Sequence, residues 1–425
     1  MNGRWILLFV LCFLPSCAVY NGPALQPEIN SLVVADRLQL AAERIGAEES
    51  DYGPGNYLLY YLDRGLVEYY AGAYPKSLRS FEKAKQRFAE LYTRSLSREA
   101  LSWVANDYAL PYRGADYEYV LVNVFQALNY LALGNVNEAL VEARDLDSKY
   151  RVVEQLARAA KRSRFEDNGF ARMFMGFVHE ATNRPEDRDS ARLFYQQAAE
   201  VYGEYYGGKY VPRVLQERLR DLDSGVDESG KAVVYVFQLA GFAPLKVPQI
   251  IPIPLDSGLL TQVVFPKFTQ RYFDTRQGQV TAVSSAGVSV RAATELGLNI
   301  GELAVKDLES RKALVLTKAV LRPALKYLVE RKQKENIQKQ FGRPAAEIFG
   351  LFSSLYNVYS EQADLRSWQA LPAEIRVARL VLDPGKYRLR FEHTSESAAL
   401  VESDDLGEQE LLPGQTCFLV TRGRR

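Results

Sequence analysis

The sequence predicts an α+β protein with a helical half followed by a β-rich half. Apolar residues recur at three- and four-residue steps from about residue 57 to about residue 220, which is the spacing of amphipathic helices. After the polar, glycine-bearing stretch 222–231, short β-branched and aromatic runs such as VVYVFQL indicate strands. Helical spacing returns over 302–362 and predicts a helical hairpin inserted into the β-rich domain.

These changes of pattern give the predicted domain boundaries. They are a signal peptide at 1–16, a lipidated N-terminus with a linker helix at 17–55, a helical domain at 56–222, a linker at 223–231, a β-rich domain at 232–300 plus 370–425, and the inserted helical hairpin at 301–369. Prolines at 248, 252 and 254 predict an edge strand or an extended arm early in the β-rich domain. Near its end, two alternating runs flank the turn residues 383–385, and we expect them to form a β-hairpin.

The N-terminus has the layout of an export signal. Arg4 gives a positive start, and an apolar run of ten residues follows from Trp5 to Leu14. A membrane-spanning helix needs roughly 20 residues, so we interpret the run as a cleaved signal. The letters LPSC that end at Cys17 resemble the lipobox of bacterial lipoproteins, although Pro15 is less usual there than a small aliphatic residue. The resemblance implies lipidation at Cys17, and the alternative is an ordinary signal with a chance cysteine.

The residue after the cysteine bears on location. Ala18 stands where an aspartate would retain an enterobacterial lipoprotein at the inner membrane. By this resemblance we expect the periplasmic face of the outer membrane, with the inner membrane as the alternative. A fully modified cysteine carries more than one acyl chain, which is enough for stable anchoring. The lipid anchor is therefore the predicted contact with a membrane.

The charge balance argues against a nucleic-acid partner, and the cysteine content argues against an intramolecular disulfide. Without residues 1–16 the chain has 52 basic and 52 acidic side chains, whereas a nucleic-acid partner calls for a basic excess. We therefore expect no nucleic-acid partner. Cys12 leaves with the signal and Cys17 carries lipid, so Cys417 is left alone and no intramolecular disulfide is expected. We expect Cys417 to be a buried core thiol.

The helical half resembles a set of tetratricopeptide repeats. Gly65, Ala127 and Gly176 stand at the position where two helices of such a repeat approach closely, and large residues follow at the packing positions. They are 62 and 49 residues apart, whereas tandem repeats show about 34. Extra helices are therefore expected between the units, for example at 97–110 and 151–165. The resemblance implies a degenerate solenoid of helical hairpins, and an irregular helical bundle is the alternative.

A search for catalytic or metal-binding patterns finds none. The only histidines, His179 and His393, lie in different predicted domains, without a cysteine pair near either. The chain has no nucleophile elbow and no phosphate-binding loop, so no cofactor, metal or catalytic residue is assigned. Acid–base chemistry through paired carboxylates, such as Glu48 with Glu49 or Asp404 with Asp405, stays open as an alternative.

Tyrosine is the most unusual feature of the composition, with 26 residues. Tyrosine combines apolar area with a hydroxyl group, which suits the binding of a peptide or a glycan. The alternative is that most of them fill gaps between helices. The candidates for partner binding are Tyr61, Tyr69, Tyr70, Tyr205 and Tyr206.

The stretch ADLRSWQALPAEIRVARLVLDPGKY resembles an uncharacterised family of proteobacterial lipoproteins with a tetratricopeptide-like N-terminal half. Asp364, Arg366 and Trp368 carry the likeness, with Leu371 and Pro372 after them. The resemblance covers most of the mature chain and implies a role in the cell envelope, near cell-wall synthesis. It implies no established activity, and no catalytic residue can be carried over.

Together these observations predict a membrane-anchored periplasmic scaffold or adaptor, with an envelope protein as its partner, that is not an enzyme. The first alternative is an envelope enzyme that acts on glycan or peptide through carboxylates. The second is a structural subunit of an envelope complex, in which the hairpin at 302–362 contacts a membrane or another subunit.

Overall fold

The structure is a computed structural model of the chain. It describes residues 22–47, 49–98, 110–159, 168–204, 206–226, 228–254, 260–310, 332–340, 343 and 363–424. The predicted signal, Cys17, Tyr205 and most of the inserted hairpin lie outside the described residues. The structure confirms the α+β class.

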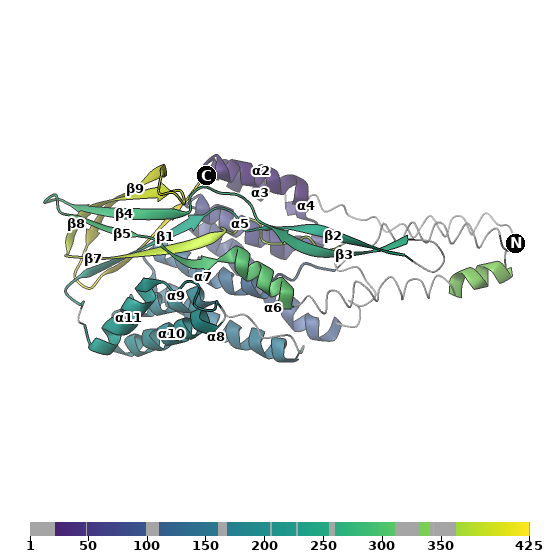
Figure 1. The fold of residues 1–425 in the computed structure, drawn as a ribbon, viewed down its shortest axis with the longest axis horizontal. Helices are drawn as coiled ribbons and strands as arrows, with labels where there is room; N and C mark the ends of the chain where they lie inside the picture. Colours follow the sequence, from purple (N-terminus) through teal and green to yellow (C-terminus); the bar gives the residue numbers. More distant parts are fainter. Residues whose placement is uncertain are drawn as a thin grey trace.

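The helices of the first half form one layer of the molecule, and two β-sheets form the other two (Figure 1). The helices are α2 (Gly22–Val34), α3 (Leu38–Ala47), α4 (Glu49–Tyr52), the 3-10 turn η1 (Pro54–Asn56), α5 (Tyr57–Tyr70), α6 (Tyr74–Arg98), α7 (Asp116–Ala132), α8 (Val136–Ala159), α9 (Gly169–Glu180), α10 (Pro185–Glu204) and α11 (Arg213–Ser224). Two further helical stretches are described at 300–310 and 332–340. Among the described residues, no helix is both long and apolar enough to span a bilayer.

The strands form two four-stranded sheets and one separate hairpin. The strands are β1 (Ala232–Ala240), β2 (Leu245–Pro254), β3 (Leu260–Thr269), β4 (Gln277–Ser284), β5 (Ser289–Ala293), β6 (Glu295–Asn299), β7 (Glu374–Leu382), β8 (Gly385–Thr394), β9 (Leu400–Leu411) and β10 (Thr416–Arg422). The inner sheet has the order β10-β1-β7-β6, and the outer sheet has the order β5-β4-β8-β9. Among the described strands, β2 and β3 pair only with each other.

The inner sheet is buried on both faces. On β1, Tyr235 and Phe237 belong to the same hydrophobic core as the helices, whereas Val234 and Val236 belong to the core between the two sheets. Successive side chains of a strand point to opposite faces. Phe177 of α9 stacks on Tyr235 with ring centroids 4.1 Å apart. The continuous apolar run in the sequence therefore reflects burial of β1 on both faces.

Three pairs of consecutive helices form hairpins: α5 with α6, α7 with α8, and α9 with α10. The predicted close approaches are confirmed at two positions. A Cβ on Gly65 would lie 2.7 Å from the Phe81 ring, and a Cβ on Gly176 would overlap the Tyr195 ring. The chain turns between α5 and α6 at Gly72, whose φ is +69°. Glycine adopts this left-handed conformation without steric cost.

Two expectations about helices are wrong. The apolar residues from Leu32 to Ile45 suggest one helix, but the chain breaks into α2 and α3 around Asp36, whose φ is +58°. Residues 151–159 were expected in a separate helix, but they continue α8. The other extra helix was expected at 97–110, and residues 99–109 of it lie outside the described residues.

The predicted hairpin around residues 383–385 is also wrong. β7 pairs with β1 and β6, whereas β8 pairs with β4 and β9, so the turn crosses from the inner sheet to the outer sheet. β7 is buried along most of its length, whereas β8 alternates buried and exposed residues. A strand that needs cover on both faces suits the middle layer, and an alternating strand suits the outer one.

Candidate functional site

The three residues that carry the family likeness lie in an extended segment, 363–373, which we call the strap. The strap leads into β7 and lies between the helical layer and the base of the β2–β3 hairpin. Side chains from both sides bind its backbone.

Carboxylates of the helical layer bind the N–H groups of the strap. Glu118 of α7 accepts a hydrogen bond from Trp368 N–H at 2.8 Å, and Asp63 of α5 accepts a longer one from Ala370 N–H at 3.4 Å. Other donors hold these carboxylates in place. Tyr112 donates to Glu118 Oε2 at 2.5 Å, and Tyr52 donates to Asp63 Oδ2 at 3.1 Å. The helical side thus presents fixed acceptors to the strap.

Cations at the base of the β2–β3 hairpin bind the carbonyl groups of the strap. Lys246 Nζ donates to the Arg366 carbonyl at 2.9 Å, and Arg271 Nη2 donates to the Gln369 carbonyl at 2.5 Å. Arg271 Nε also donates to the Ala243 carbonyl at 2.6 Å. The strap is therefore bound by acceptors on one side and by donors on the other. Charged partners make such hydrogen bonds stronger than neutral ones.

Arg366 is buried and has a partner for each side of its guanidinium group. It forms an ion pair with Asp364 at 2.8 Å, and its Nη1 donates to Asn56 Oδ1 at 2.8 Å. Its Nη2 also donates to the Leu110 carbonyl at 3.0 Å. The guanidinium lies 5.4 Å from the centroid of the Tyr112 ring. A buried charge with this many partners fixes the strap against the helical layer.

Trp368 fills the space between two helical hairpins. Its side chain is 1% exposed, and its ring lies 5.9 Å from the rings of Phe81 on α6 and Phe125 on α7, edge-on in both cases. Edge-to-face contacts of this kind add to the free energy gained by burial. The strap therefore contributes a large side chain to the core of the helical half.

Burial shifts the pKa values of the groups that hold the strap. It raises the pKa of Glu118, an effect that the positive charge of Lys246 opposes. It lowers the pKa of Arg271 to about 10. Both groups make hydrogen bonds to the strap in this structure. The arrangement is suited to holding an extended peptide segment.

The candidate tyrosines are not gathered in one place. Tyr69 and Tyr206 are buried, Tyr61 is half-buried, and Tyr70 donates to the Ala370 carbonyl of the strap at 3.1 Å. Tyr205 lies outside the described residues. Tyr69 and Tyr206 therefore fill gaps between elements, as the alternative interpretation of the tyrosines expects, and Tyr70 belongs to the strap site.

The two histidines belong to separate buried networks. His179 Nδ1 lies 3.1 Å from Asp187 Oδ1, and burial lowers the pKa of His179. His393 Nε2 lies 3.0 Å from both Asp404 Oδ2 and Thr421 Oγ1, which joins the outer sheet to the inner one. Each network links neighbouring elements of the fold.

The carboxylate pairs named from the sequence do not form joint sites in the described residues. Asp404 faces His393, whereas its neighbour Asp405 is exposed and pairs with Arg388 at 2.5 Å. Successive residues of β9 point to opposite faces, which separates them. Of the other pair, Glu48 lies outside the described residues.

A buried lysine between α7 and α8 has no counterpart in the sequence predictions. Lys149 Nζ donates to Asn123 Oδ1 at 2.5 Å and lies 4.3 Å from the centroid of the Tyr119 ring. Burial lowers its pKa to about 7, and Asp145 opposes this effect. Lys85 bridges Asp145 and Glu142 at 3.1 and 2.9 Å. In the sequence, Glu142, Asp145 and Lys149 stand at positions i, i+3 and i+7 of α8, a spacing that places them on one helix face.

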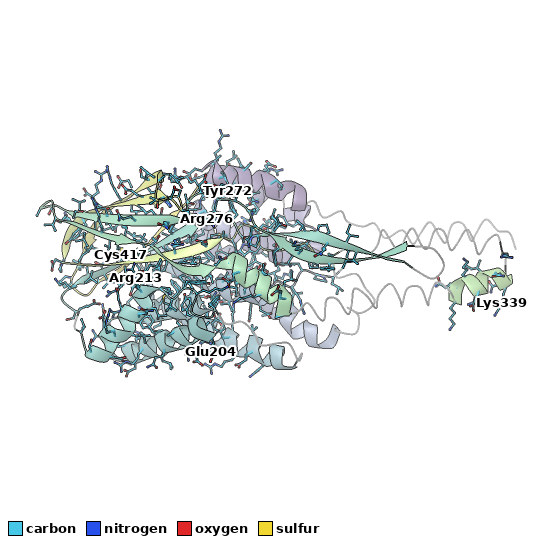
Figure 2. All side chains as sticks on the ribbon, viewed as in Figure 1. Glu204, Arg213, Tyr272, Arg276, Lys339 and Cys417 are labelled. Carbon is cyan, nitrogen blue, oxygen red and sulfur yellow. The ribbon has the colours of Figure 1, made fainter. Side chains whose placement is uncertain are left out.

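Cys417 lies on β10 among the strands (Figure 2). It is half-buried and packs against the core between the two sheets. Burial raises the pKa of its thiol to about 11, so the thiolate is scarce at neutral pH. The expected core thiol is therefore only partly buried.

Within the described residues, no group of three or more His, Cys, Asp or Glu side chains is arranged to hold a metal ion. A scan against protein-family models finds no match, and neither do searches of curated proteins and of solved structures.

Proposed function

We propose that the protein is a lipid-anchored scaffold or adaptor of the bacterial cell envelope. Its helical half would be tetratricopeptide-like and would present a surface to an envelope protein. Cys17 would carry the lipid, and the chain would lie on the periplasmic face of the outer membrane.

The strap is the observation that supports this proposal best. Its extended backbone is held by Glu118 and Asp63 on one side and by Lys246 and Arg271 on the other. Stacked helical hairpins form extended surfaces that serve for binding. Here the chain's own strap binds one side of the helical layer, so we place the partner on its outer face.

A second network supports a rigid scaffold. Arg218 of α11 binds Glu180 of α9 at 2.6 Å and Glu228 at 3.2 Å. Glu228 also pairs with Arg379 of β7, and Tyr195 of α10 donates to Glu180 at 2.5 Å. The network joins three helices to the inner sheet. Together with the strap, it fixes the orientation of the helical half at two places.

In-cell photocrosslinking tests the partner surface. We would place a photoreactive amino acid at Val141 on α8 or at Leu193 on α10, whose side chains are exposed. The matched control positions are Val288 and Leu412 in turns of the β-rich half, which are equally accessible. The expected result is one reproducible protein adduct from the helical positions and none from the control positions. If neither Val141 nor Leu193 gives a reproducible protein adduct, the scaffold proposal is contradicted.

Membrane fractionation tests the anchor separately. The expected result is that wild-type protein sediments with outer membranes, whereas Cys17→Ala protein loses the lipid mass in mass spectrometry. A Cys417→Ala variant is the matched control and is expected to keep it. An unmodified Cys17 in the mature wild-type protein would refute the lipoprotein assignment.

A further inference from the structure

The β2–β3 hairpin projects from the body of the molecule as a two-stranded ribbon (Figure 1). Its base is fixed, because Lys246 and Arg271 bind the strap and Phe268 packs against the main core. Further out, residues 248–251 are all exposed. An isolated two-stranded ribbon is marginally stable in water, so an exposed apolar one calls for a surface that covers it.

Among the described side chains of the ribbon, apolar ones are exposed on both faces. Ile250 is 56% exposed and Ile251 is 44% exposed. Consecutive side chains of a strand point to opposite faces, so these two residues show that apolar surface is exposed on each face. A protein that packs on one face would leave the other in water. An apolar medium that surrounds the ribbon would cover both.

Prolines hinder strand addition at one edge of the ribbon. Pro248 is paired with Pro266 across the ribbon, and Pro252 and Pro254 follow on the same alternation. A ladder position needs an N–H group, so these prolines occupy positions whose backbone points outwards. The outer edge of β2 therefore lacks a donor at three of its outward positions, which weakens pairing with a partner strand.

A basic helix lies at the same end of the molecule. Helix 332–340 lies beyond the hairpin along the long axis, with Lys339 labelled on it (Figure 2). Lys332, Lys334 and Lys339 are exposed, and Glu335 is the one acidic residue of this helix. Lysines near a bilayer are attracted to anionic headgroups. A basic helix thus lies at the end of the molecule towards which the apolar hairpin projects.

From these observations we propose that the β2–β3 hairpin is a second membrane-binding element, which inserts residues such as Ile250 and Ile251 into the interfacial region of an anionic lipid bilayer. Helix 332–340 would bind the same bilayer through its lysines. Insertion is shallow, because the outward carbonyl groups of the ribbon need water or headgroups as partners. This contact goes beyond the proposed function, which requires only the lipid on Cys17. It would orient the body relative to the membrane.

Vesicle flotation of the full chain tests the proposal. All proteins would carry Cys17→Ala, so none has a lipid anchor. A difference in flotation between them then cannot come from the lipid. The test variant adds Ile250→Ser and Ile251→Ser. The control variant instead adds Val288→Ser and Leu412→Ser, which are exposed aliphatic residues in turns outside the hairpin. The vesicles contain phosphatidylethanolamine with or without phosphatidylglycerol.

The expected result is that the Ile250/Ile251 variant binds phosphatidylglycerol vesicles about tenfold more weakly than the control variant, because two aliphatic anchors are lost. Replacing Lys334 and Lys339 by Glu is expected to weaken binding to these vesicles and to abolish its salt dependence. Equal flotation of the test and control variants would overturn the proposal. So would an Ile250/Ile251 variant that floats normally but loses a crosslinked protein, because a protein would then be the occupant.

Discussion

The Glu118 carboxylate binds the backbone N–H of Trp368, which lies 250 residues further along the chain. The same carboxylate also accepts hydrogen bonds from the Tyr112 hydroxyl and the Ala115 N–H. One buried side chain of α7 therefore holds both the start of its own helix and the strap that leads into the inner sheet. The stability of the helical half and that of the sheets depend on each other through this contact.

We expect Glu118→Ala to destabilise the protein by about 3–5 kcal/mol, because several donors, the Trp368 N–H among them, lose their acceptor inside the core. Urea denaturation followed by circular dichroism measures the change. Glu200→Ala on the exposed face of α10 is the control and should cost less than about 0.5 kcal/mol. Equal stability of the two variants would show that the strap contact contributes nothing.

Two glycine substitutions in the helical half should act in opposite directions. Gly176→Ala places a Cβ in the Tyr195 ring, and we expect a loss of about 1–3 kcal/mol from overpacking. Gly203→Ala in α10 meets no atom within 4 Å, and we expect a gain of up to about 1 kcal/mol from helix propensity. Thermal denaturation of both variants checks this. A Gly176→Ala protein as stable as wild type would argue against the close crossing of α9 and α10.

Lys149 should make stability depend on pH in the alkaline range. Its pKa is about 7 in the folded protein, below its ordinary value of 10.5, so the unfolded chain binds the proton more readily. Stability therefore increases as pH rises from about 7 to about 10, by at most about 1.4 kcal/mol per pH unit. We expect Lys149→Met to remove this slope, measured by urea denaturation at several pH values.

Lys76→Met is the matched control for this measurement, because Lys76 is exposed on α6. It should leave the slope unchanged. A Lys149→Met protein with the slope of wild type would mean that another group titrates in this range.

Asp404 should contribute stability that is lost in acid. Hydrogen bonds from His393 and Thr421 and the charge of Arg424 lower its pKa to about 2, against the opposing effect of burial. The folded state thus binds this proton less readily than the unfolded chain. The contribution is fully present above pH 4 and disappears as pH falls towards 2. We expect Asp404→Asn to cost about 1–2 kcal/mol at pH 7 and to lose less stability between pH 4 and 2 than wild type does.

Asp405→Asn, on the exposed face of the same strand, is the control for Asp404→Asn. It should leave the stability at pH 7 close to that of wild type, because an exposed ion pair contributes little. If the two variants show the same acid dependence, the network around His393 does not hold the carboxylate as the structure indicates.

Local patterns predicted several elements well. The run at 233–239 became the central strand β1, and Gly65 and Gly176 became helix crossings. Each of these depends on side-chain spacing and size within a short window. The hairpin predicted around residues 383–385 was wrong, because β7 and β8 pair with strands of different sheets. The turn residues 383–385 do not encode which strand β7 or β8 pairs with.

The strap site shows the same limit. The residues Asp364, Arg366 and Trp368 were singled out by resemblance, but Glu118, and the other strap-binding groups Asp63, Lys246 and Arg271, were not. Each of the four is an ordinary charged residue in its own segment. Only long-range packing brings them to one backbone.

The sequence by itself determined the α+β class, the order of helical and β-rich halves, and the positions where small residues let helices approach. Spacing and turn residues carry this information locally. The tertiary structure decided that the halves share one hydrophobic core, that the strap is bound between them, and that the β2–β3 hairpin projects from a base fixed to the strap. The reason is physical: burial, desolvation and charge pairing depend on which distant residues meet, and these contacts are made only in the folded chain.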